Sequence, residues 1–413
     1  MILDDRRGRR LILVAAAVGL IARLAFAFLY WTGKPLTHDE REYLELAASL
    51  QTGRGFTYQG PAEGTSPQFG RAPGYPLFLA AIGAGSTDAE STPARVKVVQ
   101  ALIGAGTVWL IAALAFRSAG PAAGVIAAAL AAIYPPLVFV SAYVLSETMF
   151  AALAMSAALV LQMAVQRNSI ASGGHQSRNA LGLAAGALVG AAILTRPAAL
   201  FFLPLATLWL MSTRRMVLAV AFVAAAAAAI APWTARNLRV HDRFILVASE
   251  GGVTFWTGNH PLATGEGDLA ANPELKRAEV EFRRAHSGLT GDELEPLYYR
   301  DAMTFIREQP GRWLALLARK AFFTLVPIGP SYALHSARYR VASVASYLLL
   351  LPFAAAGARR LWGSPRRPTA LFLLAASAIL VCLVFFPQER FRIPVIDPTL
   401  IICAAAFGSR YRQ

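Results

Sequence analysis

Apolar runs of about 20 residues alternate with short polar segments along most of this chain. A helical run of this length matches the thickness of the hydrocarbon core of a bilayer. We therefore predict an all-α polytopic membrane protein, a bundle of about ten transmembrane helices with a range of about 10–12. The predicted spans are 11–31, 95–116, 120–140, 146–166, 179–195, 197–213, 215–235, 338–358, 368–387 and 393–409.

The arginines orient these spans. They cluster in the short segments on one side of the predicted bundle, at Arg117, Arg167, Arg178, Arg214-Arg215 and Arg359–Arg367. Because basic residues accumulate in cytoplasmic loops, we predict that these segments and both termini lie inside. Two long loops, 32–94 and 236–337, are then external, within a single transmembrane domain over 1–413.

Two further apolar stretches do not fit a simple span. Gly74–Gly85 is too short to cross a bilayer, so we predict an interfacial or re-entrant helix with other juxtamembrane helices around it. The stretch 303–328 mixes apolar residues with basic ones, including Arg319 and Lys320, which favours an amphipathic helix on the membrane surface. A spanning helix there is the alternative, but it would move the Arg359–Arg367 cluster outside.

Composition excludes other classes of protein. The chain has 413 residues, of which 56% are hydrophobic and only 15% charged, too apolar for a soluble protein of this length. The net charge of +15 comes with no zinc-finger spacing and no RNA-binding motif, so we expect no nucleic-acid partner. Cys382 and Cys403 both lie in apolar runs, where a structural disulfide is not expected. The first run follows Arg6–Arg10 and ends in aromatic residues, which favours an uncleaved anchor although Ala25-Phe26-Ala27 resembles a cleavage site.

Negative charge at the mouth of this bundle is the first candidate for chemistry. The segment Thr37-His38-Asp39-Glu40-Arg41-Glu42-Tyr43 follows the first span directly. Thr37 and Glu40 have the spacing of a capping box, which predicts a helix beginning here. Asp39 takes no part in this capping box, and it lies in the first helical turn, where the helix dipole favours a negative charge. We therefore take Asp39 as a candidate functional carboxylate.

Other charged residues recur at the predicted external ends of spans. Arg71 precedes the short apolar helix and is either an interfacial arginine or a phosphate ligand. Glu147 is either a helix-terminal charge or a second acid in the cavity of Asp39. Arg196 is expected to pair with a carboxylate or with an anionic ligand. Arg390 and Arg392 either anchor the interface or hold a lipid phosphate.

The second external loop carries a further group of candidates. Pro232-Trp233-Thr234-Ala235-Arg236-Asn237 is followed by a glycine-rich segment ending in Gly258-Asn259-His260-Pro261. The glycine pairs predict a strand or turn over the membrane mouth at 251–261. His260 is a lone histidine, so it does not by itself indicate a metal site.

In this order the residues resemble the GT-C glycosyltransferases, and within them the bacterial branch related to protein O-mannosyltransferases and the lipid A aminoarabinose transferase. The resemblance rests on the following set: Asp39-Glu40…Tyr43, Arg71-Ala72-Pro73-Gly74-Tyr75-Pro76, Ser146-Glu147, Thr195-Arg196-Pro197, Pro232-Trp233…Arg236-Asn237, Gly258-Asn259…Pro261 and Arg390-Phe391-Arg392…Pro394. It covers nearly the whole chain, although no single motif is specific.

The resemblance implies an inverting transfer of sugar from a polyprenyl-phosphate donor to an acceptor glycan, lipid or protein. It would occur on the periplasmic face of the bacterial inner membrane. It implies that Asp39 is the general base, with Glu40 and Glu147 as further acids, and that Arg71, Arg196, Arg390 and Arg392 meet the donor phosphate. Tyr43, Arg236, Asn237, Asn259 and His260 would form the substrate loop. Some relatives need a divalent metal and others do not, so no cofactor is implied with certainty.

One departure and one alternative function stay open. The large soluble domain of many relatives is absent, which leaves the acceptor unidentified and favours a small or lipid-linked one. A transporter or flippase of a lipid-linked sugar could use the same charged residues. We see no inverted repeat and no charges at the midpoints of spans, which favours the enzyme.

Overall fold

The structure, a computed structural model, describes residues 6–58, 70–166, 174–267 and 269–409. Within these ranges helices occur without strands, which confirms the predicted all-α class. Six of the described helices are long and apolar enough to cross a bilayer. They are α1 (Arg6–Ala25, continued by a π-helical segment to Tyr30), α4 (Ala94–Ala119), α7 (Glu147–Gln166), α8 (Gly174–Thr195), α10 (Met216–His241) and α15 (Ala337–Trp362).

The other four predicted spans are helical but not simple. The span expected at 120–140 is a pair, α5 (Pro121–Ile133) and α6 (Pro135–Phe139), bent by 57°. The bend falls at Tyr134 because Pro135 lacks an amide hydrogen and forces the preceding residue out of the helical region. The remaining three are the shorter apolar helices α9 (Phe202–Ser212), α16 (Thr369–Val384) and α18 (Ile396–Gly408).

Small residues let these helices pack closely. Gly186 and Gly190, one turn apart on α8, face α10. A Cβ on Gly186 would lie 2.1 Å from the carbonyl oxygen of Phe222, and one on Gly190 would lie 2.5 Å from Cβ of Ala229. Such contacts replace the hydrophobic effect as the source of helix association in a bilayer.

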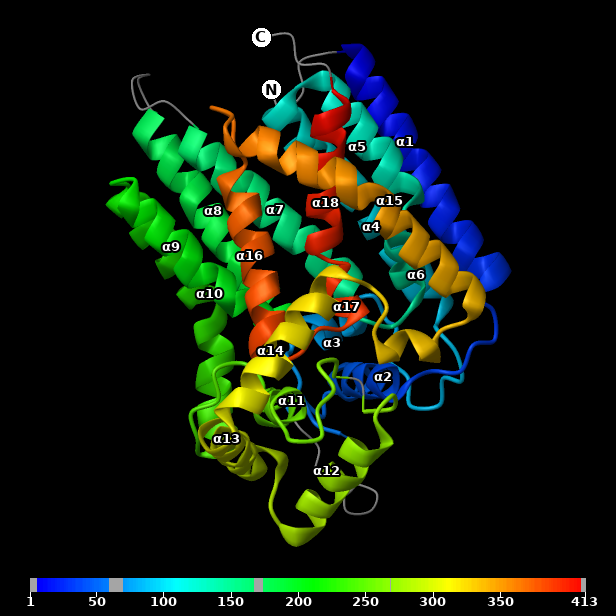
Figure 1. Cartoon of the computed structure of the whole chain (residues 1–413), viewed down its shortest axis with the longest axis vertical. Coiled ribbons are helices and arrows are strands. Elements are labelled where there is room, and N and C mark those ends of the chain that lie inside the picture. The colour runs from blue at the N-terminus through cyan, green and yellow to red at the C-terminus, as the bar shows by residue number, and fades with distance from the viewer. Residues whose placement is uncertain (1–5, 59–69, 167–173, 268, 410–413) are drawn as a thin grey trace.

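The juxtamembrane helices gather at one end of the bundle, opposite the end where α1 begins and α18 finishes (Figure 1). They are α2 (His38–Gln51), α3 (Gly74–Ala81), α11 (Gly251–Gly258), α12 (Pro273–Ala285), α13 (Gly291–Glu308), α14 (Pro310–Leu325) and α17 (Glu389–Arg392). The short helix α3 lies where the apolar run from Gly74 predicts one.

Two predictions for the second loop hold only in part. The segment 251–261 begins with helix α11 and not with a strand. Gly252 allows α11 to pack closely against α13, since a Cβ on Gly252 would lie 2.4 Å from the carbonyl oxygen of Glu295. The stretch 303–328 is divided between α13 and α14 at Pro310, and neither helix has the length and composition of a span.

Lys320 is not on the surface of α14 as its sequence suggests. It is fully buried, and its Nζ donates to Oδ1 of Asn259 at 3.0 Å and to the carbonyl oxygen of Leu383 at 3.1 Å. Burial lowers the pKa of Lys320 to about 7. Lys320 therefore joins α14 to α11 and α16 as a buried hydrogen-bond donor.

Candidate active site

Adjacent acids on α2 have different environments. Oε2 of Glu40 accepts hydrogen bonds from the amide of Thr37 at 2.8 Å and from Oγ1 of Thr37 at 2.9 Å, which confirms the predicted capping box. Oε1 of Glu40 accepts from the amide of Val144 at 2.9 Å. Glu40 is thus buried among hydrogen-bond donors of the backbone, and the residues that line the site cavities do not include it. Glu40 therefore positions the start of α2, and the chemical role expected from the sequence stays a prediction.

Asp39 points instead toward two arginines from distant parts of the chain. Nη2 of Arg71 donates to Oδ1 of Asp39 at 2.8 Å, and Nη1 of Arg390 donates to Oδ2 at 2.6 Å. Arg71 lies just before α3 and Arg390 lies on α17. Each carboxylate oxygen therefore has its own guanidinium partner.

Arg71 is surrounded by acids. Besides Asp39, it donates to Glu42 and to Oε2 of Glu250, the latter at 3.0 Å. Glu42 follows Asp39 by three residues and so lies on the same face of α2. The sequence analysis did not select Glu42 or Glu250. The spacing of Glu42 from Asp39 could have revealed the first, whereas nothing local to Glu250 indicates that α11 begins beside Arg71.

These contacts set the charge of the site. Burial would raise the pKa of the Asp39 carboxyl, but Arg390 and Arg71 outweigh burial and hold that pKa well below its usual range. At Glu42 the balance is reversed: burial raises the pKa although Arg71 opposes it. Asp39 is therefore the carboxylate that stays ionised, beside an arginine that it shares with two other acids.

A second ion pair lies in the same cavity. Nη1 of Arg196, from the junction of α8 and α9, lies 2.6 Å from Oε1 of Glu147 at the start of α7, as expected for an arginine paired with a carboxylate. Oε2 of Glu147 is buried and receives no hydrogen bond from the residues that the structure describes. The guanidinium carbons of Arg196 and Arg390 lie 4.9 Å and 5.5 Å from the ring centroid of Phe391. Phe391 thus holds the two cations on one aromatic side chain.

Two cavities meet at Asp39. The first, of about 350 Å³, extends between membrane helices and has an apolar wall that includes Leu200, Phe201, Leu374 and Val381. The second, of about 880 Å³, lies under α12 and the loop before α15, and it has more charged side chains on its walls, including Lys276, Glu279 and Arg283. We call the first the apolar cavity and the second the polar cavity. Residues shared by both are Asp39, Arg71, Leu145, Glu250, Thr254, Phe386 and Arg390. Tyr43, Glu147 and Arg196 line the apolar cavity alone.

The structure does not bring the other candidates into these cavities. Arg392 is buried in an ion pair with Asp397 at 2.8 Å, and its guanidinium carbon lies 4.1 Å from the ring centroid of Tyr347. Arg236 donates to the carbonyl oxygen of Phe56, and Asn237 donates to those of Ile245 and Val247.

Asn259 and His260 also have contacts within the protein. Asn259 is buried and accepts from Lys320 and Trp313, and Nδ1 of His260 accepts from the amide of Leu262 beside the ring of Trp256. These two residues, with Arg236, Asn237 and Arg392, hold elements around the site and do not line it.

The described residues do not fit a resident divalent metal. Among them, no three His, Cys, Asp or Glu side chains lie together as a metal ion would require. Both oxygens of Asp39 accept from guanidinium groups, so a cation there would meet two positive charges.

Comparisons with known proteins agree with this architecture. Residues 73–235 match the sequence family described as dolichyl-phosphate-mannose-protein mannosyltransferase. No curated protein sequence matches the chain.

Among solved structures, the archaeal oligosaccharyltransferase AglB from Archaeoglobus fulgidus, in complex with an inhibitory peptide and a dolichol-phosphate, is similar with a TM-score of 0.56. Its identity is 16% over 97% of this chain and 50% of that chain. ArnT from Cupriavidus metallidurans in the apo state has a TM-score of 0.42 and 17% identity over 96% of this chain and 76% of that chain. The chain thus spans about half the length of the oligosaccharyltransferase. Residues 73–235 thus resemble the mannosyltransferase family, and the chain has a fold similar to that of the oligosaccharyltransferase.

Proposed function

We propose that the chain is a glycosyltransferase that moves a sugar from a polyprenyl-phosphate donor to an acceptor hydroxyl. The observation that carries this proposal is that two cavities meet at one ionised carboxylate, Asp39: one extends between membrane helices, and the other has the larger number of charged side chains. A lipid-linked donor needs a site with an apolar wall and a phosphate-binding end, whereas a hydroxylated acceptor needs a polar one. The AglB structure in complex with a dolichol-phosphate supports a lipid-linked donor for this fold.

The transfer is a single inverting displacement. The acceptor oxygen attacks the anomeric carbon from the polar cavity, and the bond between that carbon and the phosphate oxygen breaks. Asp39 takes the proton of the acceptor hydroxyl, and the departing polyprenyl phosphate carries away the negative charge. Glu147 Oε2, which has no donor among the described residues, would accept a hydrogen bond from a sugar hydroxyl.

Arg390 is the better candidate to bind the donor phosphate, and Arg71 to orient Asp39. Arg71 already contacts Asp39, Glu42 and Glu250, so a phosphate approaching it would meet their repulsion. Arg390 has Asp39 as its carboxylate partner and lines the apolar cavity with Arg196. When Arg390 turns to the phosphate, Asp39 loses one of its two cations and its pKa rises, which makes it a stronger base.

We also infer where this site faces. The basic segments lie at the other end of the bundle, so the positive-inside rule assigns the site to the periplasmic face of a bacterial inner membrane. The acceptor would be a glycan, lipid or protein on that side.

The test compares wild type with Asp39→Asn in proteoliposomes supplied with polyprenyl-phosphate sugars from the host and with a lipid and protein extract as acceptor. Free polyprenyl phosphate is measured by mass spectrometry. We expect carrier release by the wild type that depends on the extract and is lost about 100-fold or more in Asp39→Asn, the usual scale for a missing general base. Asp88→Asn, an exposed acid outside both cavities, is the matched control and should release carrier at the wild-type rate.

The binding of carrier separates the outcomes. If the folded wild type binds a lipid-linked sugar but never releases the carrier, the transferase proposal is wrong and a flippase becomes the better account. If Asp39→Asn releases carrier as fast as Asp88→Asn, Asp39 is not the base.

A further inference from the structure

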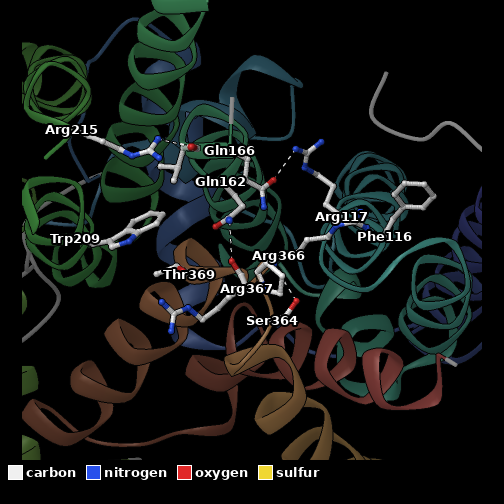
Figure 2. Close-up of a pocket in the computed structure, with 12 residues that line it drawn as sticks. Phe116, Arg117, Gln162, Gln166, Trp209, Arg215, Ser364, Arg366, Arg367 and Thr369 are labelled. Carbon is white, nitrogen blue, oxygen red and sulfur yellow. Dashed lines mark hydrogen bonds between the residues drawn. The ribbon is translucent and has the colours of Figure 1, made fainter. Parts of the chain in front are cut away.

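A third cavity, of about 760 Å³, lies at the opposite end of the bundle from Asp39. Figure 2 shows that its walls come from the ends of several helices. Arg117 comes from the end of α4, Arg215 precedes α10, and Arg366 and Arg367 lie in the connection between α15 and α16. We call this the arginine cavity.

None of the described residues that line the arginine cavity is acidic. They include four arginines and no Asp or Glu. The sequence also has no Asp or Glu between Glu90 and Glu147, between Glu147 and Asp242, or between Glu308 and Glu389. These intervals supply all of those lining residues, so the elements that build the cavity bring no carboxylate to it.

Uncharged acceptors hold two of the arginines in place. Nη2 of Arg117 donates to Oε1 of Gln166 at 2.9 Å, while its Nε is buried and has no hydrogen-bond partner among the described residues. Nη1 of Arg215 donates to the carbonyl oxygen of Val165. A guanidinium bound to an amide or carbonyl oxygen keeps its full charge and remains able to attract an anion.

A buried side chain holds part of the cavity wall in place. Gln162 on α7 is 5% exposed, and its Nε2 donates to the carbonyl oxygen of Arg367 at 3.1 Å. Its Oε1 accepts from the amide of Ala370 at 3.1 Å. These two bonds fix the segment that presents Arg366 and Arg367, whose side chains are exposed at the rim (Figure 2).

Apolar side chains complete the lining. Phe116 and Trp209 lie among the arginines, and Trp209 belongs to the membrane helix α9. Aromatic residues and arginines side by side are typical of the interfacial region of a bilayer, where lipid phosphates lie next to acyl chains.

We propose that the arginine cavity binds the phosphate of an anionic membrane lipid. The guanidinium fork matches phosphate oxygens, and the missing carboxylates leave an anion as the natural partner. The aromatic wall favours a lipid over a soluble phosphate. This inference does not depend on the proposed transferase activity, because the cavity lies at the other end of the bundle and shares no residue with the two cavities at Asp39.

Native mass spectrometry of the full chain in mild detergent tests this proposal. Phosphatidylglycerol is the probe, phosphatidylcholine is the zwitterionic comparison, and glycerol phosphate is the soluble one. The variant Arg366→Gln/Arg367→Gln removes two exposed charges from the cavity. The matched control, Arg10→Gln/Arg359→Gln, removes two exposed charges from elements outside its lining.

We expect wild type and control to retain phosphatidylglycerol in preference to phosphatidylcholine. The cavity variant should bind it more weakly by roughly fivefold for each arginine. Equal loss in cavity variant and control would mean that the arginines supply only general surface charge, and would overturn the proposal. Glycerol phosphate binding as tightly as phosphatidylglycerol would show a soluble phosphate site and would also overturn it. Because both variants change exposed side chains, circular dichroism should show the same helix content for both.

Discussion

At the scale of single residues, the two arginines beside Asp39 affect both its ionisation and its strength as a base. A carboxylate held by Arg71 and Arg390 is reliably ionised, but a low pKa also makes it a weak base. Burial works in the other direction and would raise the pKa if either cation left. If Arg390 moved from Asp39 to a donor phosphate, the pKa of Asp39 would therefore rise and Asp39 would become a stronger base.

Substitution of Arg390 should make this rise in the pKa of Asp39 visible in the pH profile of activity. In Arg390→Gln, the pKa of Asp39 rises because burial remains and one cation is gone. Activity that needs the carboxylate is present above that pKa and disappears as pH falls through it, so the acid limb of kcat/KM should move to higher pH by about one unit or more. The rate at every pH should also fall by about 100-fold, since a contact to the leaving phosphate is lost.

Arg390→Lys is the control for this experiment, because it keeps the positive charge beside Asp39. Its acid limb should stay close to that of the wild type even if its rate falls. An acid limb that does not move in Arg390→Gln would mean that Arg390 does not control the ionisation of Asp39.

At the scale of elements, the first turn of α2 assigns different tasks to adjacent acids. Glu40 closes the capping box with Thr37 and also accepts from the amide of Val144, so it fixes where α2 begins and how it meets the segment before α7. Asp39 is rotated by about 100° about the helix axis from Glu40, and it enters the cavity as a result. The cap thus stabilises the first turn of the helix that carries Asp39.

Loss of the cap should cost stability and leave the chemistry intact. We expect Thr37→Ala to lower the free energy of unfolding by about 1 kcal/mol, the usual contribution of an N-cap side chain. Turnover per folded molecule should stay near that of the wild type, since Thr37 bonds to Glu40 and not to Asp39. Thermal unfolding in detergent and carrier release by the folded fraction measure the two effects.

Thr87→Ala, in the exposed loop after α3, is the matched control and should change stability by less than about 0.5 kcal/mol. If Thr37→Ala abolished turnover without lowering stability, Thr37 would belong to the active site.

At the scale of the whole molecule, the length of the apolar runs was enough to predict the helical bundle, and each predicted span falls on helix. Local rules also predicted the cap of α2 and the short helix α3. The bend at Tyr134 depends on Pro135, and the length of the apolar run alone does not predict it. The pairing of Arg71 with Glu250 and of Arg390 with Asp39 joins residues far apart in sequence, so only the packed chain could show it.

The same long-range packing gives some of the predicted site residues partners within the protein. Asn259 and Arg392 carry polar groups that suggest a site, yet each is buried with partners from other helices. In a bilayer, a buried polar group needs such partners as much as a catalytic group needs a substrate. In a sequence, polar residues that form hydrogen bonds between helices therefore look the same as residues of a functional site.

The distribution of charge over the whole molecule predicts its orientation. The described acids that line a cavity do so at the end with Asp39, and the arginine cavity lies at the other. Ser287, exposed between α12 and α13, and Gly363, exposed after α15, mark the two ends. A Cβ on Gly363 would meet no atom within 4 Å, and Cys382 and Cys403 are buried, so both positions suit single-cysteine labelling.

An impermeant maleimide should therefore label Ser287→Cys in intact cells. It should label Gly363→Cys only after the membrane is opened, because the positive-inside rule puts the arginine end in the cytoplasm. Labelling of Gly363→Cys from outside would reverse the orientation. The site of Asp39 would then face the cytoplasm, and the acceptor would have to be sought there.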